Sequence, residues 1–479
     1  MMGNSKHSST RKDNSTRKIK EADRKSRWIR LWQSLRYTFL SVPSSAVETF
    51  LLYGTFGLLM FGPLAFGAVD HWSTFILEAG SVLLFLIWLA KQLRDGEGGV
   101  VIQWNPLFLP MAAFAVLVLV QIAFRFSAYT HDTVSTALLY CAYAMLCFLS
   151  GQTLLRSAQA RKLAFMFTLY GFAVAAFALL YGISPNGRLY WVYPTHGGWI
   201  YGPYVNHNHY AGLMELLVPI PLVLAFTRLA DDRERIAAAV AAAIMVGTIF
   251  LSGSRGGMLA IFAELAVMAV VLLRQKRIVR VAIGLAAFAV VLLVMLTWLG
   301  GKELTARVSS ISTESRAEIS GGMRFSIDRD SVRMFRQKPV LGWGLGTFPV
   351  VYPQFRSFYT NFFVNEAHND YLQLLTEMGA LGFATMLWFL FVLFRNAVPK
   401  MKNWSTDVNG AVTLACVLGL SGILVHSLFD FNLQIPANAA LFYVFCTIAA
   451  APSLLQRTRK RKPALPASEE QLIPTSEVV

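Results

Sequence analysis

The feature that most constrains this chain is a series of apolar blocks, each about twenty residues long. An α-helix of that length crosses roughly 30 Å of hydrocarbon. Only 15% of the 479 residues are charged, too few to cover the surface of a soluble protein of this size. We therefore predict an all-α, polytopic membrane protein with about 12 transmembrane helices. The expected spans lie near residues 46–66, 73–90, 106–124, 134–154, 163–182, 211–229, 236–251, 258–273, 281–299, 369–394, 409–426 and 438–455.

The distribution of Lys and Arg predicts the orientation of these spans, because such residues accumulate in cytoplasmic loops. Every second loop is basic and both tails belong to that set, so we expect both termini in the cytoplasm. The N-terminal 36 residues hold eleven Lys or Arg, and from Trp28 onward apolar residues recur as in a helix lying on the membrane surface. Much of the net charge of +16 therefore reflects topology and anionic membrane lipids, and we expect no nucleic-acid partner.

These patterns divide the chain into five regions. They are a basic cytoplasmic tail with an interfacial helix (1–45), transmembrane helices 1–9 (46–300), an outer loop domain (301–367), transmembrane helices 10–12 (368–456) and a second cytoplasmic tail (457–479). The loop domain is too long for a simple connection, so we expect it to fold, partly as helix, over the membrane. It holds nine basic and six acidic residues, and the resulting charge of +3 suggests an anionic ligand.

One basic stripe stands out within the loop domain. Arg329, Arg333 and Arg336 have the spacing of one helix face, and the helix should end near Pro339. The alternative is a solvated face whose arginines pair with the neighbouring acids at 328 and 330. The sequence alone leaves both interpretations open.

A second outward segment, SGSRGG at 252–257, places Arg255 where an apolar span reaches the membrane surface. The flanking glycines let other backbones approach closely, and a guanidinium held there offers a fixed fork of donors to a phosphate. The alternative is an arginine that extends to the lipid headgroups.

A third segment, YGPYVNHNHYAG at 201–212, leads directly into a span. Asn206 and Asn208 offer amides suited to sugar hydroxyls, and His207 and His209 alternate with them. Two histidines could chelate a metal, but no third ligand lies nearby, so a loop-to-helix cap is the favoured alternative.

The fourth segment, EAHNDYLQLLTEMGALG at 366–382, returns the outer domain to the membrane. His368 stands at the start of the tenth span, where an imidazole could take a proton from a sugar hydroxyl. Asp370, two residues later, is an alternative candidate for the base. His368 could also serve only as a cap of the helix.

Taken in order, YVNHNHYAGLMELLVPIPL, FLSGSRGGMLA, GMRFSIDRDSVRMFRQKPVLGWGLGTF and NEAHNDYLQLLTEMGALG resemble the O-antigen ligase and polymerase family over roughly residues 200–385. The resemblance implies a glycosyltransferase of the bacterial inner membrane, with its active site under a large periplasmic loop. One direct displacement at the anomeric carbon would make the transfer inverting. It implies an undecaprenyl-diphosphate-linked glycan as donor, and lipid A-core or a growing glycan as acceptor. By the same resemblance, Arg255 and Arg324 hold the diphosphate and His368 is catalytic. The NHNH sequence departs from the family pattern, in which many members have a proline between the asparagines.

The resemblance implies no cofactor and no metal. The pair Asp328 and Asp330 has the Asp-x-Asp spacing of metal-dependent sugar-diphosphate enzymes. Its arginine-rich surroundings favour internal ion pairs instead, with arginine supplying the positive charge.

Three related activities remain open from the sequence. A ligase moves finished O-antigen onto lipid A-core, a polymerase extends the glycan on its own carrier, and a protein O-oligosaccharyltransferase uses a protein acceptor. We adopt the ligase interpretation from the overall match of the motifs. A transporter of the same lipid would explain the spans and the acids within them, but we find no internal repeat, and the polar motifs cluster on one face.

Overall fold

The computed structural model describes residues 44–95, 102–195, 198–275, 279, 290, 321–360 and 363–452. Over these residues the protein is all-α apart from one two-stranded hairpin, β1 (Arg188–Leu189) and β2 (Tyr193–Pro194). The helices of the bundle are α2 (Ser44–Leu64), α3 (His71–Asp95), α4 (Phe108–Ala123), α5 (Thr130–Thr153), α6 (Ser157–Ile183), α7 (His207–Leu217), α8 (Pro219–Phe226), α9 (Asp232–Ser252), α10 (Arg255–Arg274), α14 (Asp370–Lys400), α15 (Val408–His426) and α16 (Pro436–Ala450).

The prediction of a polytopic membrane protein is confirmed. Nine helical segments of the described chain are long and apolar enough to cross a membrane, with α7 and α8 counted as one span. Two shorter apolar helices, α4 and α16, occupy the positions of the third and twelfth expected spans. The surface helix after Trp28 and the C-terminal tail lie outside the described residues, as do the N-terminal tail before residue 44 and the expected ninth span at 281–299 apart from residue 290.

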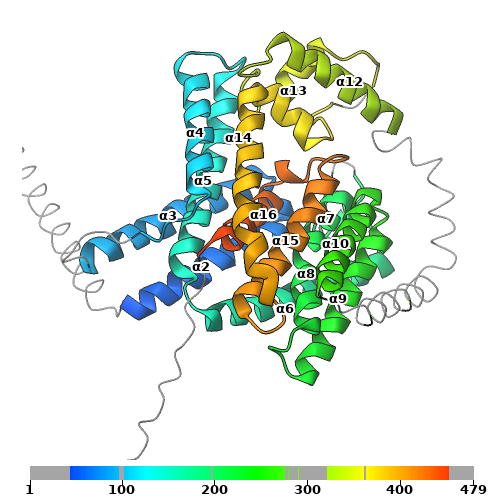
Figure 1. Cartoon of the computed structure of the whole chain (residues 1–479). Coiled ribbons are helices and arrows are strands. Elements are labelled where there is room, and N and C mark those ends of the chain that lie inside the picture. Colours follow the sequence, from blue (N-terminus) through cyan, green and yellow to red (C-terminus); the bar gives the residue numbers. More distant parts are fainter. Residues whose placement is uncertain are drawn as a thin grey trace, which may run out of the picture.

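The described part of the predicted loop domain begins at residue 321 and forms a small layer above one end of the bundle, called the outer layer or outer segment below (Figure 1). It contains α12 (Gly321–Gln337), α13 (Phe348–Val351) and the 3-10 turn η3 (Tyr352–Gln354). Ile327 and Met334 of α12 pack against Phe348 and Tyr352, so this layer has a core of its own. Apolar burial of this kind holds a long loop in one conformation.

The glycine-rich turn after α12 joins this layer to the bundle. Gly342, Gly344 and Gly346 all have positive φ angles, which side chains disfavour. Gln121 of α4 donates to Leu341 O at 2.6 Å and accepts from Leu345 N at 3.1 Å. The motif GWGLGTF is therefore an attachment between the outer layer and the bundle.

Helix α14 is interrupted at Gly379, where φ is +63° and ψ is −168°. Because of this interruption, the backbone amides that follow Gly379 lack carbonyl acceptors within α14. Carbonyl groups of the outer segment accept their hydrogen bonds instead. Ala380 N donates to Pro339 O at 2.8 Å, and Leu381 N donates to Val340 O at 3.2 Å. A Cβ at Gly379 would lie 2.4 Å from the backbone of Val340, so only glycine permits this approach.

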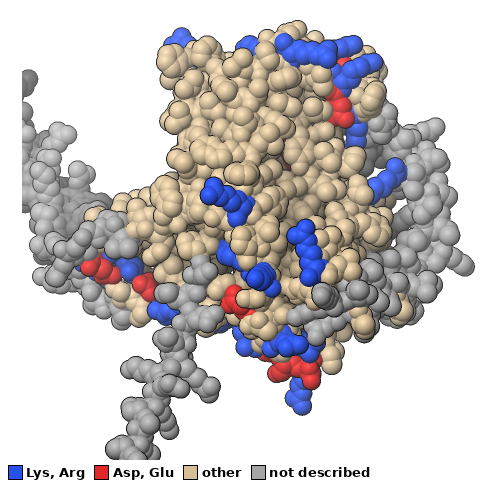
Figure 2. Space-filling model, viewed as in Figure 1, with Lys and Arg blue, Asp and Glu red and all other residues tan. Residues whose placement is uncertain are grey.

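Charged residues are sparse on the middle of the bundle. In the face shown in Figure 2, Lys and Arg gather over α12 and again over the loops at the opposite end, with mostly uncharged residues between. A membrane protein shows this distribution because burying charge in hydrocarbon is costly.

Candidate functional site

The four sequence motifs converge on one short segment, residues 427–432, which connects α15 to the 3-10 turn η5 (Asn432–Gln434). The start of α14, the N-terminal part of α12, the start of α7 and the start of α10 all lie against this connection or against the last turn of α15. The contacts are described below, motif by motif.

His368 immediately precedes α14 and has a φ of +53°, a conformation unusual for a residue with a side chain. Its Nδ1 is 3.6 Å from Asp430 Oδ1, and its ring meets the Phe431 ring edge-on at 4.8 Å. The side chain is 12% exposed. Asn369 accepts from the amides of Tyr371 and Leu372, and so caps α14 beside the histidine.

Arg324 lies in the first turns of α12 and reaches the same connection. Its Nη1 donates to Phe429 O at 2.7 Å, and its Nη2 is 3.6 Å from Asp430 Oδ2. The Nε atom is buried without a partner among the described residues, although the side chain as a whole is 28% exposed. Arg324 therefore retains donor capacity for a ligand.

Asp430 links this histidine and this arginine. Burial alone would raise the pKa of its carboxyl, but the adjacent His368 imidazole and Arg324 guanidinium hold that pKa well below its usual range. Its Oδ1 also accepts from Phe431 N at 2.9 Å. Asp430 is therefore a fixed negative charge that faces two groups able to be positive.

Asp328 adds a second carboxyl to this region. It follows Arg324 by one helical turn of α12, so both lie on the same side of the helix. Burial raises the pKa of Asp328 to about 6, and the nearby His368 imidazole and Arg324 guanidinium moderate that rise. Asp330 has different partners, because its carboxylate accepts from Ser357 N at 2.8 Å and Ser357 Oγ at 2.9 Å.

The NHNH motif begins α7. Asn206 is the N-cap and accepts from Asn208 N at 2.8 Å, so the expected loop-to-helix cap is confirmed. The Asn208 side chain is buried. His209 packs edge-on against Phe431 at 4.7 Å, which places it on the same ring as His368.

His207 connects this motif to the SGSRGG motif. Its Nδ1 lies 2.9 Å from Ser252 O at the end of α9, and its ring stacks on Trp199 at 4.7 Å. Arg255 is the exposed first residue of α10, whose cap, Ser254, accepts from Gly257 N.

The glycines of SGSRGG bring the start of α10 onto α15. A Cβ at Gly256 would lie 2.4 Å from the His426 ring, so the imidazole fills the space beside the glycine. His426 Nδ1 lies 2.7 Å from Glu215 Oε1 inside the bundle. Asp430 N donates to His426 O at 3.1 Å. His426, at the end of α15, therefore contacts both Asp430 and the start of α10, the helix that Arg255 begins.

Asp370 is fully engaged by its neighbours. Its carboxylate accepts from Ser427 Oγ at 2.8 Å, Leu433 N at 3.2 Å and Gln434 Nε2 at 3.1 Å. These bonds tie the start of α14 to both ends of the 427–432 connection. The remaining predicted residue, Arg329, is exposed and donates to Ser357 Oγ at 3.0 Å, within the outer layer.

The paired acids of the DRD sequence face different partners. Asp330 belongs to the outer layer, whereas the Asp328 carboxyl is influenced by His368 and Arg324. Among the residues that the structure describes, no group of three or more His, Cys, Asp or Glu is arranged to hold a metal.

Sequence reasoning missed Asp430 and Phe431, which organise the site. The available signal was a single acid in the short segment SLFDF, between two apolar spans on the side of the other motifs. It also missed Glu377, whose carboxylate accepts from Gly346 N at 2.8 Å and Phe348 N at 3.2 Å.

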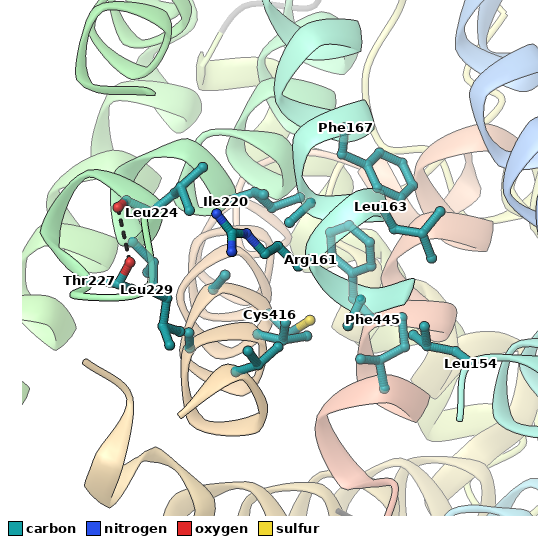
Figure 3. Close-up of a pocket in the computed structure, with 18 of the residues that line it drawn as sticks. Leu154, Arg161, Leu163, Phe167, Ile220, Leu224, Thr227, Leu229, Cys416 and Phe445 are labelled. Atoms are coloured by element: carbon teal, nitrogen blue, oxygen red, sulfur yellow. Dashed lines mark hydrogen bonds between the residues drawn. The ribbon is translucent and has the colours of Figure 1, made fainter. Parts of the chain in front are cut away.

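A separate cavity of about 80 Å³ lies among α6, α8, α15 and α16 (Figure 3). Its walls are mostly apolar, and Arg161, which is among the residues that line it, is 2.9 Å from Glu234 Oε2. The residues that line it include none of those gathered around the 427–432 connection.

No curated protein matches the chain significantly. One family model does match, over residues 240–387, and its description is O-antigen ligase. The matched segment includes Arg255, Arg324, Asp328, His368 and Asp370, and the match supports glycan transfer of the ligase or polymerase type. Residues 240–387 of this protein are therefore similar to the O-antigen ligase family, which supports the resemblance of the sequence motifs.

Proposed function

We propose that this protein is an O-antigen ligase, which transfers an undecaprenyl-diphosphate-linked glycan to lipid A-core on the periplasmic face of the inner membrane. The observation that carries the proposal is the position of Asp430 between His368 and Arg324, at 3.6 Å from each. A base and a cation for a diphosphate thereby lie side by side at one end of the bundle.

His368 acts as the general base. With Nδ1 turned toward the negative Asp430, the proton of a neutral imidazole resides on Nδ1, and Nε2 is left as an acceptor. Nε2 then takes the proton of the acceptor hydroxyl as that oxygen attacks the anomeric carbon. Asp430 stabilises the imidazolium that forms.

Arg324 and Arg255 bind the donor diphosphate. The bond between the anomeric carbon and the phosphate oxygen breaks as the acceptor oxygen bonds, so negative charge grows on the departing diphosphate. Arg324 has an unused donor, and Arg255 stands at the N-terminus of α10, where helix amides favour an anion. One direct displacement inverts the anomeric centre, and the two arginines supply the positive charge without a metal.

The other sequence residues take supporting roles. Asp370 positions the 427–432 connection, Asn206 caps α7, and Asn208 lies buried in the first turn of that helix. Arg329 stabilises the outer layer through Ser357.

The test is transfer by purified protein in detergent, with an undecaprenyl-diphosphate-linked glycan as donor. Parallel reactions offer lipid A-core, a second donor molecule or an acceptor protein. A product on lipid A-core supports the ligase. Elongation of the donor glycan alone would assign a polymerase, and modified protein alone would assign an oligosaccharyltransferase. Absence of any product in detergent, combined with donor movement across proteoliposomes, would contradict transfer altogether.

A further inference from the structure

Two ionisable side chains are paired within the membrane-spanning part of the bundle, next to the site. Glu215 of α7 and His426 at the end of α15 meet at 2.7 Å between Oε1 and Nδ1. Both side chains are buried, at 0% and 1% exposure. Ionisable residues are costly inside a membrane and usually serve a function there. The mechanism proposed above uses neither residue, so the role of this buried pair is open.

The buried pair contacts the start of α10, where Arg255 stands. The His426 ring fills the space beside Gly256, and a Cβ at Gly257 would lie 3.2 Å from Glu215 Oε1. Each of the two glycines that follow Arg255 thus faces one member of the pair. A shift of either side chain would therefore move the first turn of α10, and Arg255 with it.

The same histidine holds the segment that follows α15. Its carbonyl oxygen accepts from Phe429 N at 2.9 Å and from Asp430 N at 3.1 Å. Phe429 O in turn accepts from Arg324 Nη1 at 2.7 Å. Both arginines of the proposed diphosphate site and the aspartate beside the proposed base are therefore connected to His426 through no more than two contacts.

Glycines on α15 let two other helices approach the buried pair closely. A Cβ at Gly419 would lie 3.0 Å from the backbone oxygen of Glu215, and the Glu264 carboxyl of α10 fills the space beside Gly422. With His426, these glycines have the spacing i, i+3 and i+7 of one helix face. Close packing leaves little room for adjustment, so the hydrogen bond at the end of this face determines how α7 and α10 sit on α15.

We propose that the pair of Glu215 and His426 positions Arg255 and Asp430 relative to each other, and so aligns the departing diphosphate with the base. This inference rests on the proposed function, which supplies the roles of the two positioned residues. A buried ionisable pair is weak evidence for stability, but it can select one packing arrangement among several. Both members are buried, so they act through the residues that they hold. A misplacement of about 1 Å can cost roughly a hundredfold in rate.

The test replaces the buried pair by apolar residues. A double variant, Glu215→Leu with His426→Leu, should fold, because apolar replacement of a whole buried pair is often neutral or stabilising. We nevertheless expect it to lower kcat and to weaken binding of a polyprenyl diphosphate without glycan, each by about tenfold or more. Because the two residues form one contact, either single variant should lose about as much as the double variant. Glu215→Gln keeps an acceptor for His426 and should stay within about threefold of wild type.

Glu264→Leu is the matched control. Glu264 is another buried acid between α10 and α15, but it lies nine positions after Arg255 along α10. The variant makes the same chemical change in the same interface, so it reports any general effect of removing a buried acid. We expect its kcat and its affinity for the polyprenyl diphosphate to stay within about twofold of wild type, since it leaves the hydrogen bond at the end of α15 intact. Thermal unfolding in detergent measures the stability of every variant.

Several outcomes would overturn the proposal. They are wild-type kcat and affinity in the double variant, an equal loss in Glu264→Leu, single losses that multiply in the double variant, and losses that follow the melting temperature across the series. The last result would assign the pair to stability alone. Binding of the polyprenyl diphosphate does not depend on turnover. Wild-type protein that binds it but transfers no glycan would contradict the proposed function, and the affinities of the variants would still test the positioning of Arg255.

Discussion

Asp430 Oδ1 lies 3.6 Å from Nδ1 of His368, although 62 positions separate the two residues in the chain. The contact unites a predicted residue with one that the motifs did not include. It also defines the orientation of the imidazole on which the proposed base mechanism depends.

The base mechanism predicts that His368→Ala loses a factor of about 10² to 10⁴ in turnover at saturating donor, with little change in donor binding. The fall of turnover toward low pH, the acid side of the profile, should disappear in this variant. Asp370→Asn should retain that acid side, since the Asp370 carboxylate is occupied by Ser427, Leu433 and Gln434. An unchanged acid side in His368→Ala, together with lost turnover in Asp370→Asn, would transfer the role to the aspartate.

Asp430→Asn should impair turnover while leaving the protein folded. The amide has nearly the same size but no charge, so it stabilises neither the correct tautomer nor the imidazolium, and we expect a loss of about 10²-fold or more. Because the pKa of Asp430 is held well below its usual range, the acid side of the wild-type profile should not arise from this residue. Full turnover in Asp430→Asn would remove Asp430 from the mechanism.

Lysine in place of Arg255 or Arg324 should lower kcat/KM by about tenfold or more, because the ammonium keeps the charge but loses the planar fork of donors. The matched control is Arg329→Lys, on the same helix as Arg324 but in contact with Ser357. That variant should differ little from wild type. The measurement is transfer at varied donor concentration, and equal activity of all three variants would contradict a diphosphate clamp.

Glu366 gives a prediction for stability against pH. Burial raises its pKa to about 8 from the usual 4.5, so the folded state keeps a proton that the unfolded state loses. Stability from this group is present at low pH and is lost as the pH rises from 4.5 toward about 8. Glu366→Gln should therefore melt higher than wild type at pH 8.5 and show a smaller difference at pH 5, as measured by thermal unfolding in detergent. A difference independent of pH would contradict this protonation.

The proposed orientation predicts labelling from the periplasmic side. Tyr359 lies in the outer layer and is 85% exposed. A cysteine at this position, in a Cys141→Ser background, should react with a membrane-impermeant thiol reagent in cells with a permeabilised outer membrane. Asn403→Cys, exposed in the loop after α14 at the opposite end, should react only after lysis. A cysteine at Ser312, which lies outside the described residues, should react in the same way as one at Tyr359. The reverse pattern of labelling would contradict the proposed topology.

The spans were predictable because each needs only its own apolar length, as in Asp232–Ser252 and Val408–His426. The helix of the loop domain was predictable from the spacing of Arg329, Arg333 and Arg336, and it ends at Gln337 as expected. The partners of those arginines were not predictable, because the spacing of residues along a helix does not reveal which side of that helix faces a core. Arg333 does lie 3.4 Å from Asp330, whereas Asp328 points toward a site built from other helices.

Asp430 and Phe431 were harder to predict for the same reason. They come from a segment without a periodic pattern, and their importance depends on the packing of α7, α12 and α14 around it. Gly379 was likewise uninformative in the sequence, since a glycine within an apolar span indicates neither a break nor a partner.

The break at Gly379 determines how parts of this protein could be exchanged with those of a relative. Pro339 and Val340 serve as acceptors for Ala380 and Leu381, so the outer segment completes the hydrogen bonding of the helix that follows it. Ala380 and Leu381 are exposed on the bundle, so a chimera that imported the outer segment alone would leave these amides without well-placed acceptors at a surface where lipid cannot replace them. The natural cassette for grafting therefore runs from residue 321 through the first turn beyond Gly379, with both sides of the junction taken from one parent.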